Sequence, residues 1–182
     1  MSTSTGDKQR TSLTGVYTVL PTPFAEDDSL DLPSLERLVD FVIARGVDGF
    51  LVLGFLGEAA KLTTAEQEEV ISTAVATARG RSKVVVGASA GGTKLSVLKA
   101  ARARDLGADA LLIAPPLQDD ATILAHFEAI GNAVELPIVV HDYPQATGIR
   151  MTPALLAELC NRVPRIGAVK LEDPPTGPKL QA

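Results

Sequence analysis

The segment Arg45-Gly-Val-Asp-Gly-Phe-Leu-Val52 recurs along the chain as Leu106-Gly-Ala-Asp-Ala-Leu-Leu-Ile113. Each copy joins the end of an amphipathic stretch, a glycine suited to a left-handed helix end, an Asp turn and a short apolar run. A continuous apolar run is typical of a strand that is covered on both faces. The chain therefore reuses one helix-to-strand joint, which indicates βα units around a parallel sheet.

Similar apolar runs lie on both sides of these two copies. We expect strands at residues 16–20, 49–53, 84–88, 110–114, 137–141 and 167–170. Helix start signals separate them, such as the capping box Thr63-Thr-Ala-Glu66. Residues 1–12 are polar and predict a flexible leader, so the folded domain is expected to cover residues 13–182.

Two architectures can be built from such units, an open doubly wound sheet and a closed (β/α)8 TIM barrel. An open sheet often carries a glycine-rich phosphate loop after its first strand. Here the first strand runs into Pro21-Thr-Pro-Phe24, and the glycine-rich turn Gly87-Ala-Ser-Ala-Gly-Gly92 lacks the Lys-Ser/Thr ending of a nucleotide loop. The sequence favours the TIM barrel.

Composition excludes several classes of protein. The chain has 17 Lys and Arg against 22 Asp and Glu, without a block of like charges, which argues against binding nucleic acid or a membrane surface. It has neither a membrane-spanning apolar stretch nor a secretion signal, so we expect a cytoplasmic protein. The single cysteine, Cys160, is expected to be a small buried apolar residue. No metal-ligand spacing is present, and no cofactor is expected.

Reactive groups of parallel α/β folds collect where strands end. Lys170 follows the apolar run Ile166-Gly-Ala-Val169, so the strand is expected to deliver an amine to the mouth of the sheet. Desolvation there lowers the pKa of a lysine, and a neutral amine can attack a carbonyl group. The alternative is a lysine that reaches water and pairs with Glu172 or Asp173.

The two histidines differ in their surroundings. His141 ends an apolar strand and is a candidate acid or base, and Tyr143 is expected to face the same way if the chain stays extended. His126 lies in the middle of an expected helix beside Phe127 and is interpreted as structural.

Several short motifs follow one another from about Gly15 to the end of the chain. They are Pro21-Thr-Pro-Phe24, Gly54-x-x-Gly-Glu58 with Leu62-Thr-x-x-Glu66, Gly107-Ala-Asp109 leading into Pro115, Ala125-His-Phe127, Pro144-x-x-Thr-Gly148 and Val169-Lys170. In this order they resemble the dihydrodipicolinate synthase and N-acetylneuraminate lyase family. The resemblance implies a (β/α)8 barrel, often a tetramer, in which the lysine matched by Lys170 forms a Schiff base with a 2-oxo acid, commonly pyruvate.

This chain departs from the family pattern at several positions. Phe55-Leu56 replaces two hydroxyl residues of the turn, and His141 stands where the family has its proton-transferring tyrosine. Pro115-Pro-Leu117 replaces Pro-Tyr-Tyr, and Ala146 replaces an arginine. We therefore expect a Schiff-base lyase of the aldolase or dehydratase type rather than a dihydrodipicolinate synthase.

The resemblance assigns residues to a more apolar site. Lys170, His141 and Tyr143 are the catalytic candidates, and a small carbonyl substrate is expected to contact Phe55, Leu56, Gly57 and Leu117. The other function that we consider is a catalytically inactive barrel that serves as a binding or regulatory subunit. The missing hydroxyl residues and the missing arginine suggest it.

The chain is too short to form a complete barrel. A complete TIM barrel typically needs about 250 residues, whereas this sequence of 182 residues ends just after its sixth expected strand. Pro174-Pro175, Gly177 and Pro178 predict a terminal loop. We expect a fragment of a protein that is a homo-oligomer, a tetramer or a dimer, when full length; supply of the missing units by another chain is the alternative.

Overall fold

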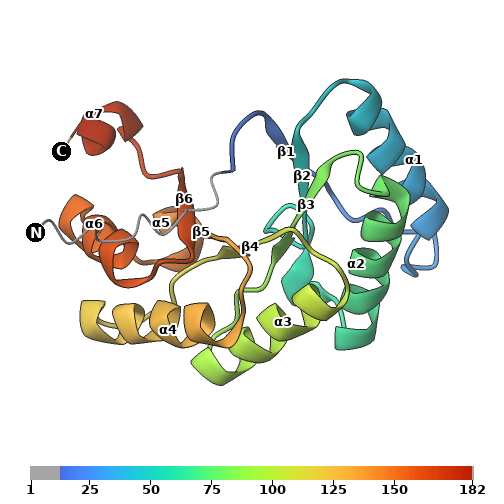
Figure 1. Cartoon of the computed structure of the whole chain (residues 1–182). Coiled ribbons are helices and arrows are strands. Elements are labelled where there is room, and N and C mark those ends of the chain that lie inside the picture. The colour runs from blue at the N-terminus through green and yellow to red at the C-terminus, as the bar shows by residue number, and fades with distance from the viewer. Residues whose placement is uncertain (1–12, 182) are drawn as a thin grey trace, which may run out of the picture.

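A computed structural model describes residues 13–181 as strands that alternate with helices (Figure 1). The strands are β1 (Tyr17–Val19), β2 (Gly49–Val52), β3 (Lys83–Gly87), β4 (Ala110–Ile113), β5 (Ile138–Asp142) and β6 (Ile166–Leu171). The helices are α1 (Leu32–Ala44), the 3-10 helix η1 (Ala59–Lys61), α2 (Thr64–Ala78), α3 (Thr93–Asp105), α4 (Asp120–Ala133), α5 (Pro144–Thr147), α6 (Pro153–Arg162) and α7 (Thr176–Gln181). Each predicted strand boundary lies within one residue of the observed one.

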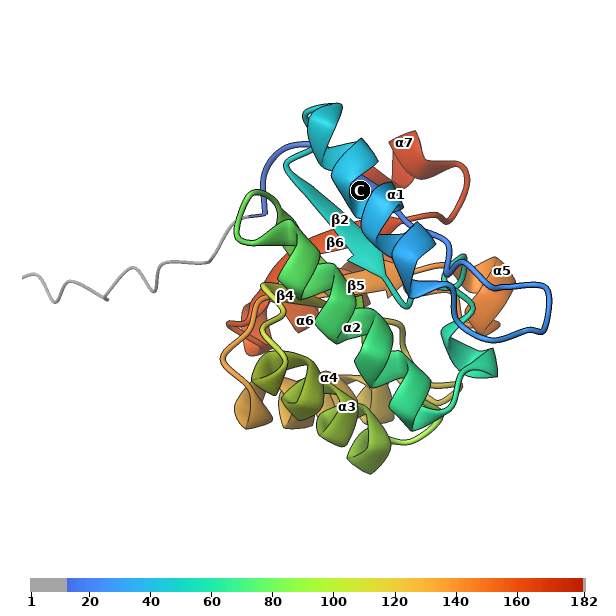
Figure 2. The same ribbon diagram turned by 90° about the vertical axis from the view of Figure 1, so that its right-hand side faces the viewer.

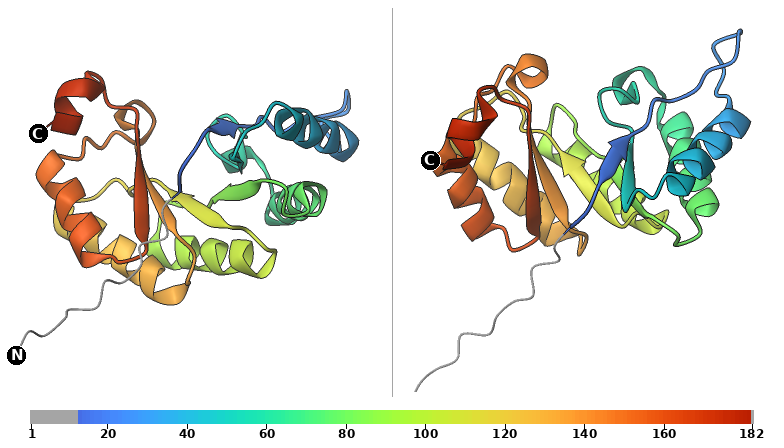
Figure 3. Two further views of the ribbon diagram at one scale, coloured as in Figure 1. Left: turned by 45° about the horizontal axis from the view of Figure 1, so that its top comes forward. Right: turned by 90° about the horizontal axis from the view of Figure 1, so that it is seen from above.

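The six strands form one parallel sheet in chain order, β1-β2-β3-β4-β5-β6. Figure 3 shows the sheet curved into an open arc, with helices along its outer side. The predicted partial TIM barrel is thus confirmed: the chain supplies six strands of the barrel wall. The predicted leader, residues 1–12, lies outside the described residues, so the boundary between leader and domain stays a prediction.

The outer face of the sheet carries the main apolar core. Phe50 of β2 and Ile113 of β4 are fully buried there against helix residues such as Phe127 of α4. Figure 2 shows α1 and α2 side by side on this outer side. Cys160 of α6 packs against the same core and is partly buried.

The inner face of the sheet carries a smaller apolar layer, formed by Leu51, Val85, Ala110 and Leu112. Three residues of this layer, Leu51, Val85 and Leu112, line a cavity of about 210 Å³ that extends to Tyr17 and Lys170. Successive side chains of each strand therefore point alternately into the helix-covered core and into the barrel interior.

The repeated joint has one structural role in both copies. Gly46 and Gly107 take the left-handed conformation (φ 82° and 94°) that ends α1 and α3. Asp48 then accepts a hydrogen bond from the Val16 N–H at 2.7 Å, and Asp109 accepts one from the Val84 N–H at 2.8 Å. Each aspartate thus ties the start of its own strand to the start of the preceding one.

Side-chain caps begin several of the helices. Thr63 and Glu66 form the predicted capping box at the start of α2. Asp119 accepts from the Thr122 N–H at 2.8 Å at the start of α4. Among the helices of residues 13–181, none is both long enough and apolar enough to cross a membrane.

The predicted terminal loop is wrong, because α7 begins at Thr176. Pro178 is the third residue of this helix. The first four N–H groups of a helix have no partner inside the helix, so a proline in this turn removes no helical hydrogen bond. The Pro and Gly content of the segment therefore did not prevent a short helix.

Candidate functional site

Lys170 and His141 come together at the carboxyl ends of neighbouring strands. The register of β5 and β6 places His141 directly opposite Lys170, and Lys170 Nζ lies 3.3 Å from His141 Nε2. The Lys170 side chain is 31% exposed, whereas that of His141 is 3% exposed. The amine is therefore held at the inner rim of the barrel beside an imidazole that is shielded from water.

Glu172 joins these two groups. Its Oε1 atom lies 2.8 Å from Lys170 Nζ, and its Oε2 atom lies 2.6 Å from His141 Nε2. Sequence reasoning treated Glu172 only as a possible ion-pair partner of Lys170. Glu172 follows Lys170 by two residues, and in an extended segment this spacing puts both side chains on one face. This spacing was the signal in the sequence that could have placed Glu172 at the site.

Glu172 is ionised and accepts from both neighbours. Burial acts to raise the pKa of its carboxyl group, but the hydrogen bonds from Lys170 and His141 outweigh this effect and lower the pKa. Because an ionised carboxylate can only accept, we assign the proton of the neutral imidazole to His141 Nε2. The three side chains thus form a connected path for a proton.

His141 is neutral at neutral pH. Burial lowers the pKa of its imidazole, and the positive charge of Lys170 acts in the same direction, while Glu172 and Asp142 oppose the shift. A neutral imidazole can take up a proton during a reaction.

An aromatic cluster covers His141. Tyr143 stacks on the imidazole with ring centroids 5.4 Å apart and an interplanar angle of 20°. The Phe55 ring lies 5.5 Å from the His141 ring and 5.6 Å from the Tyr143 ring. Tyr143 and Phe55 therefore adjoin the imidazole, and the predicted catalytic candidates and one predicted pocket residue meet in one place.

Phe55 lies on a turn that follows β2 and folds over β3. Thr22 Oγ1 donates to the Gly57 carbonyl at 2.6 Å and anchors this turn to the segment after β1. Leu53 has a positive φ of 58°, which is uncommon for a residue with a side chain. Strained backbone of this kind is concentrated at functional sites.

The turn borders a cavity of about 720 Å³. The cavity is lined by Leu53, Phe55, Leu56, Leu112 and His141, together with other residues that include Ser89 and Lys99. Burial lowers the pKa of the Lys99 amine. The predicted residues Phe55 and Leu56 thus line the space next to the site.

The other two predicted pocket residues lie elsewhere. Gly57 is buried within the turn and does not line the cavity. Leu117 is 70% exposed and does not line the cavity either. Gly57 therefore belongs to the backbone of the turn, while Leu117 is exposed and lies outside this cavity.

His126 is buried between α3 and α4. Its Nδ1 atom lies 3.0 Å from Thr93 Oγ1, and burial lowers the pKa of the imidazole. Its place between two packed helices agrees with the structural role predicted for it. Within residues 13–181, no group of three or more His, Cys, Asp or Glu side chains is placed to hold a metal ion.

The two buried histidines predict a loss of stability in mild acid. Both pKa values are lowered in the folded state, so below about pH 6.5 the unfolded chain binds protons that the folded chain does not. Unfolding free energy should then fall by up to about 1.4 kcal/mol per pH unit for each histidine, until the folded-state pKa is reached. Urea unfolding between about pH 7.5 and 5.5 measures this slope. The slope should be smaller in His126→Gln; equal stability of the unmodified protein across this range would contradict the expectation.

Comparison with known proteins identifies the family. The model of the dihydrodipicolinate synthetase family matches residues 12–172 of the chain. The chain belongs to this family. The predicted resemblance is thereby confirmed, and the match ends two residues beyond Lys170.

Members of the family resemble the chain in sequence and in structure. The 4-hydroxy-tetrahydrodipicolinate synthase of Maridesulfovibrio salexigens is 36% identical over 159 residues, which cover 86% of this chain and 54% of the relative. The Xanthomonas campestris protein of the same name is 38% identical over 162 residues, or 87% and 53% of the two chains. The crystal structure of dihydrodipicolinate synthase from Rhodopseudomonas palustris matches with a TM-score of 0.86 and 35% identity over 93% of this chain and 58% of that chain. The chain thus spans about half the length of the curated relatives that it matches.

Proposed function

We propose that the protein is a lyase that forms a Schiff base through Lys170 and acts on a 2-oxo acid or a related carbonyl compound. The observation that carries this proposal is the contact of Lys170 Nζ with Glu172 at 2.8 Å and with His141 at 3.3 Å. An amine that attacks a carbonyl must first lose a proton, and the Glu172 carboxylate, to which His141 Nε2–H donates, can receive it. Membership of the dihydrodipicolinate synthetase family supports the proposal.

The proposed reaction begins with transfer of a proton from the Lys170 ammonium to the Glu172 carboxylate. The lone pair of Nζ then attacks the carbonyl carbon, and a proton moves from this nitrogen to the former carbonyl oxygen to give a neutral carbinolamine. Loss of this hydroxyl group as water, with the proton returned from Glu172, forms the protonated imine. The imine withdraws electrons from the neighbouring carbon, so that a carbon–carbon bond there can form or break, or a hydroxyl group can leave as water.

The substrate is proposed to carry an apolar group. Phe55 and Leu56 present hydrocarbon to the cavity beside His141, whereas the family pattern has hydroxyl residues there. A pocket of this kind favours hydrocarbon and leaves polar groups without partners. Although the relatives described above are named as 4-hydroxy-tetrahydrodipicolinate synthases, these differences favour an aldolase or a dehydratase for a less polar substrate.

Borohydride trapping tests the proposal. The protein is incubated with pyruvate, or with a 2-oxo acid that has a branched apolar chain, and is then reduced, digested and weighed by mass spectrometry. We expect an adduct on the peptide that contains Lys170, and faster trapping of the branched acid. Faster trapping of pyruvate would contradict the apolar substrate.

The alternative function, an inactive barrel that binds or regulates, has one observation in its favour. Lys170 forms an ion pair with Glu172, with 2.8 Å between Nζ and Oε1. This is the contact expected of a lysine that has no role in catalysis. No adduct with any carbonyl compound would favour this alternative.

His141→Phe tests the acid–base role. The phenyl ring fills a similar space but carries no proton, so trapping should slow by about 10²- to 10⁴-fold, as is usual for loss of a general acid or base. The pH dependence assigned to the imidazole should disappear as well. Tyr143→Phe is the matched comparison, since it removes only the phenol hydroxyl group. A larger effect of Tyr143→Phe would transfer the role to Tyr143, and an unchanged rate and pH profile in His141→Phe would show that the assignment is wrong.

A further inference from the structure

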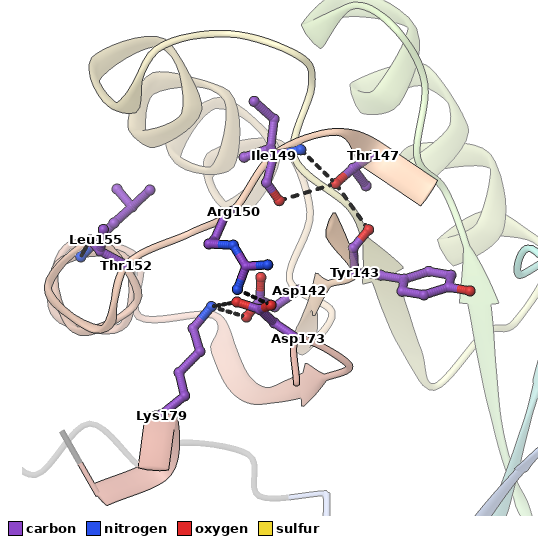
Figure 4. Close-up of polar contacts among 9 residues, drawn as sticks. All are labelled: Asp142, Tyr143, Thr147, Ile149, Arg150, Thr152, Leu155, Asp173 and Lys179. Carbon is purple, nitrogen blue, oxygen red and sulfur yellow. Dashed lines mark hydrogen bonds and ion pairs between the residues drawn. The ribbon is translucent and has the colours of Figure 1, made fainter. Parts of the chain in front are cut away.

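A buried group of charged side chains lies behind the site, on the outer face of β5 and β6 (Figure 4). Asp142 is fully buried and Asp173 is 2% exposed. Lys179 Nζ lies 2.6 Å from Asp142 Oδ2 and 2.9 Å from Asp173 Oδ2. Arg150 also forms an ion pair with Asp173. The two carboxylates are thus balanced by two cations, of which only Lys179 contacts both.

This charged group is one residue away from the site on each strand. Asp142 follows His141, and Asp173 follows Glu172. Consecutive side chains of an extended chain point to opposite faces, so His141 and Glu172 face the barrel interior while their successors face outward. The Glu172 N–H also donates to the Asp142 carbonyl at 2.8 Å, which joins the two segments directly. A single peptide unit therefore connects His141 on the inner face to Asp142 on the outer face, and another connects Glu172 to Asp173.

The Lys179 ammonium group compensates the charge of the two buried carboxylates. The Lys179 side chain is 10% exposed, although α7, from which it projects, buries none of its residues fully. Asp142 Oδ1 is buried and has no hydrogen-bond partner in the described part of the chain. Because a buried carboxylate without a compensating charge is strongly unfavourable, Asp142 and Asp173 would separate or admit water if the ammonium group were lost.

We propose that Lys179 is a positioning residue, which ties the ends of β5 and β6 together from the outer face and so fixes His141 against Glu172 at the inner site. This inference rests on the proposed function for its effect on the reaction, but the geometry that it predicts can be measured without any reaction. Figure 4 shows Lys179 reaching from α7 to Asp142 and Asp173, while the Tyr143 ring points away from them. The residue acts through the backbone of others and does not touch the reacting atoms.

The two histidines of the chain provide the measurement. Nitrogen-15 spectra of the imidazole rings report the protonation and hydrogen bonding of each histidine. In Lys179→Met we expect the His141 signal to lose the pattern of an Nε2–H bonded to a carboxylate. The signal of His126, which lies between α3 and α4, should stay unchanged and is the internal reference. Lys94→Met, at an exposed lysine of α3, is the matched control and should leave both signals as they are.

The trapping rate provides the second measurement. In Lys179→Met the rate constant at saturating pyruvate should fall by about ten- to a hundredfold, the usual result of displacing a reacting group by about 1 Å. The pyruvate concentration at half-saturation should change little, because Lys179 does not contact the substrate. Lys179→Arg keeps the positive charge and should recover most of the rate. A purely structural lysine would lower the melting temperature without changing the rate of the protein that remains folded.

Each outcome decides the inference. An unchanged His141 signal together with an unchanged trapping rate in folded Lys179→Met would overturn it. If Lys179→Met does not fold, Asp142→Asn, which removes one of the two buried charges, replaces it, and an unchanged His141 signal and rate in that variant would overturn the inference equally. If the unmodified protein forms no adduct but the His141 signal still responds to Lys179→Met, the positioning role stands and the proposed function fails.

Discussion

Lys170→Ala is expected to eliminate the borohydride-trapped adduct completely, while the protein remains folded. The Lys170 side chain is partly exposed at the barrel rim, so its truncation leaves no buried cavity. Without the amine there is no nucleophile to form the imine, whereas His141 and Glu172 keep their hydrogen bond. Mass spectrometry of the digested protein gives the result directly, and circular dichroism confirms the fold.

Two further variants make this result specific. Lys170→Arg keeps a positive charge next to Glu172 but cannot form a Schiff base with a 2-oxo acid, so it should also give no adduct. Lys99 is the competing amine, because it lines the neighbouring cavity and burial lowers its pKa. Lys99→Ala should leave the adduct on Lys170. An adduct that persists in Lys170→Ala and disappears in Lys99→Ala would place the chemistry on the other lysine.

Gly87→Ala is expected to cost about 3 kcal/mol of unfolding free energy, at the upper end of the usual range for overpacking. A Cβ atom at this position would lie 2.0 Å from the Leu53 carbonyl oxygen. The atom that it meets belongs to the backbone, so no side-chain rotation relieves the contact. The turn that carries Phe55 must move away from β3 instead, and His141 loses one of its aromatic neighbours.

Gly91→Ala is the matched control for this prediction. A Cβ atom at Gly91 meets nothing within 4 Å, and the backbone there does not need a positive φ. Urea unfolding should therefore show a large decrease in stability for Gly87→Ala and little change for Gly91→Ala. Equal stability of the two variants would show that the turn does not depend on close approach to Gly87.

The fold could be predicted from the sequence because its signals are local. Apolar runs such as 110–114 and caps such as Thr63 mark where strands and helices begin, and their regular alternation indicates a parallel barrel. Part of the candidate site could be expected for the same reason, since Lys170 and His141 both end apolar strands. Their 3.3 Å contact then follows from the pairing of β5 with β6.

The remaining part of the site depends on register and on faces of the sheet, which a single sequence does not display. In the sequence, Glu172 is one of several carboxylates near Lys170. Only the pairing of β5 with β6 shows that it also forms a hydrogen bond with His141. The buried contact of Lys179 with Asp142 joins residues far apart in sequence, and the Pro-rich segment between them obscured the helix α7. Leu117 was inferred from the family pattern, but whether its side chain reaches the site depends on the loop conformation.

The aspartates of the two repeated joints align the strands at the rim opposite to the lysine. Asp48 and Asp109 hold β1 to β2 and β3 to β4 at their amino ends, whereas Phe55, His141 and Glu172 all lie at or beyond the carboxyl ends. The contacts that align the strands and the residues of the candidate site therefore lie at opposite rims of the sheet. Substitutions in the loops that follow the strands should therefore alter the candidate site while leaving the Asp48 and Asp109 contacts at the amino ends intact.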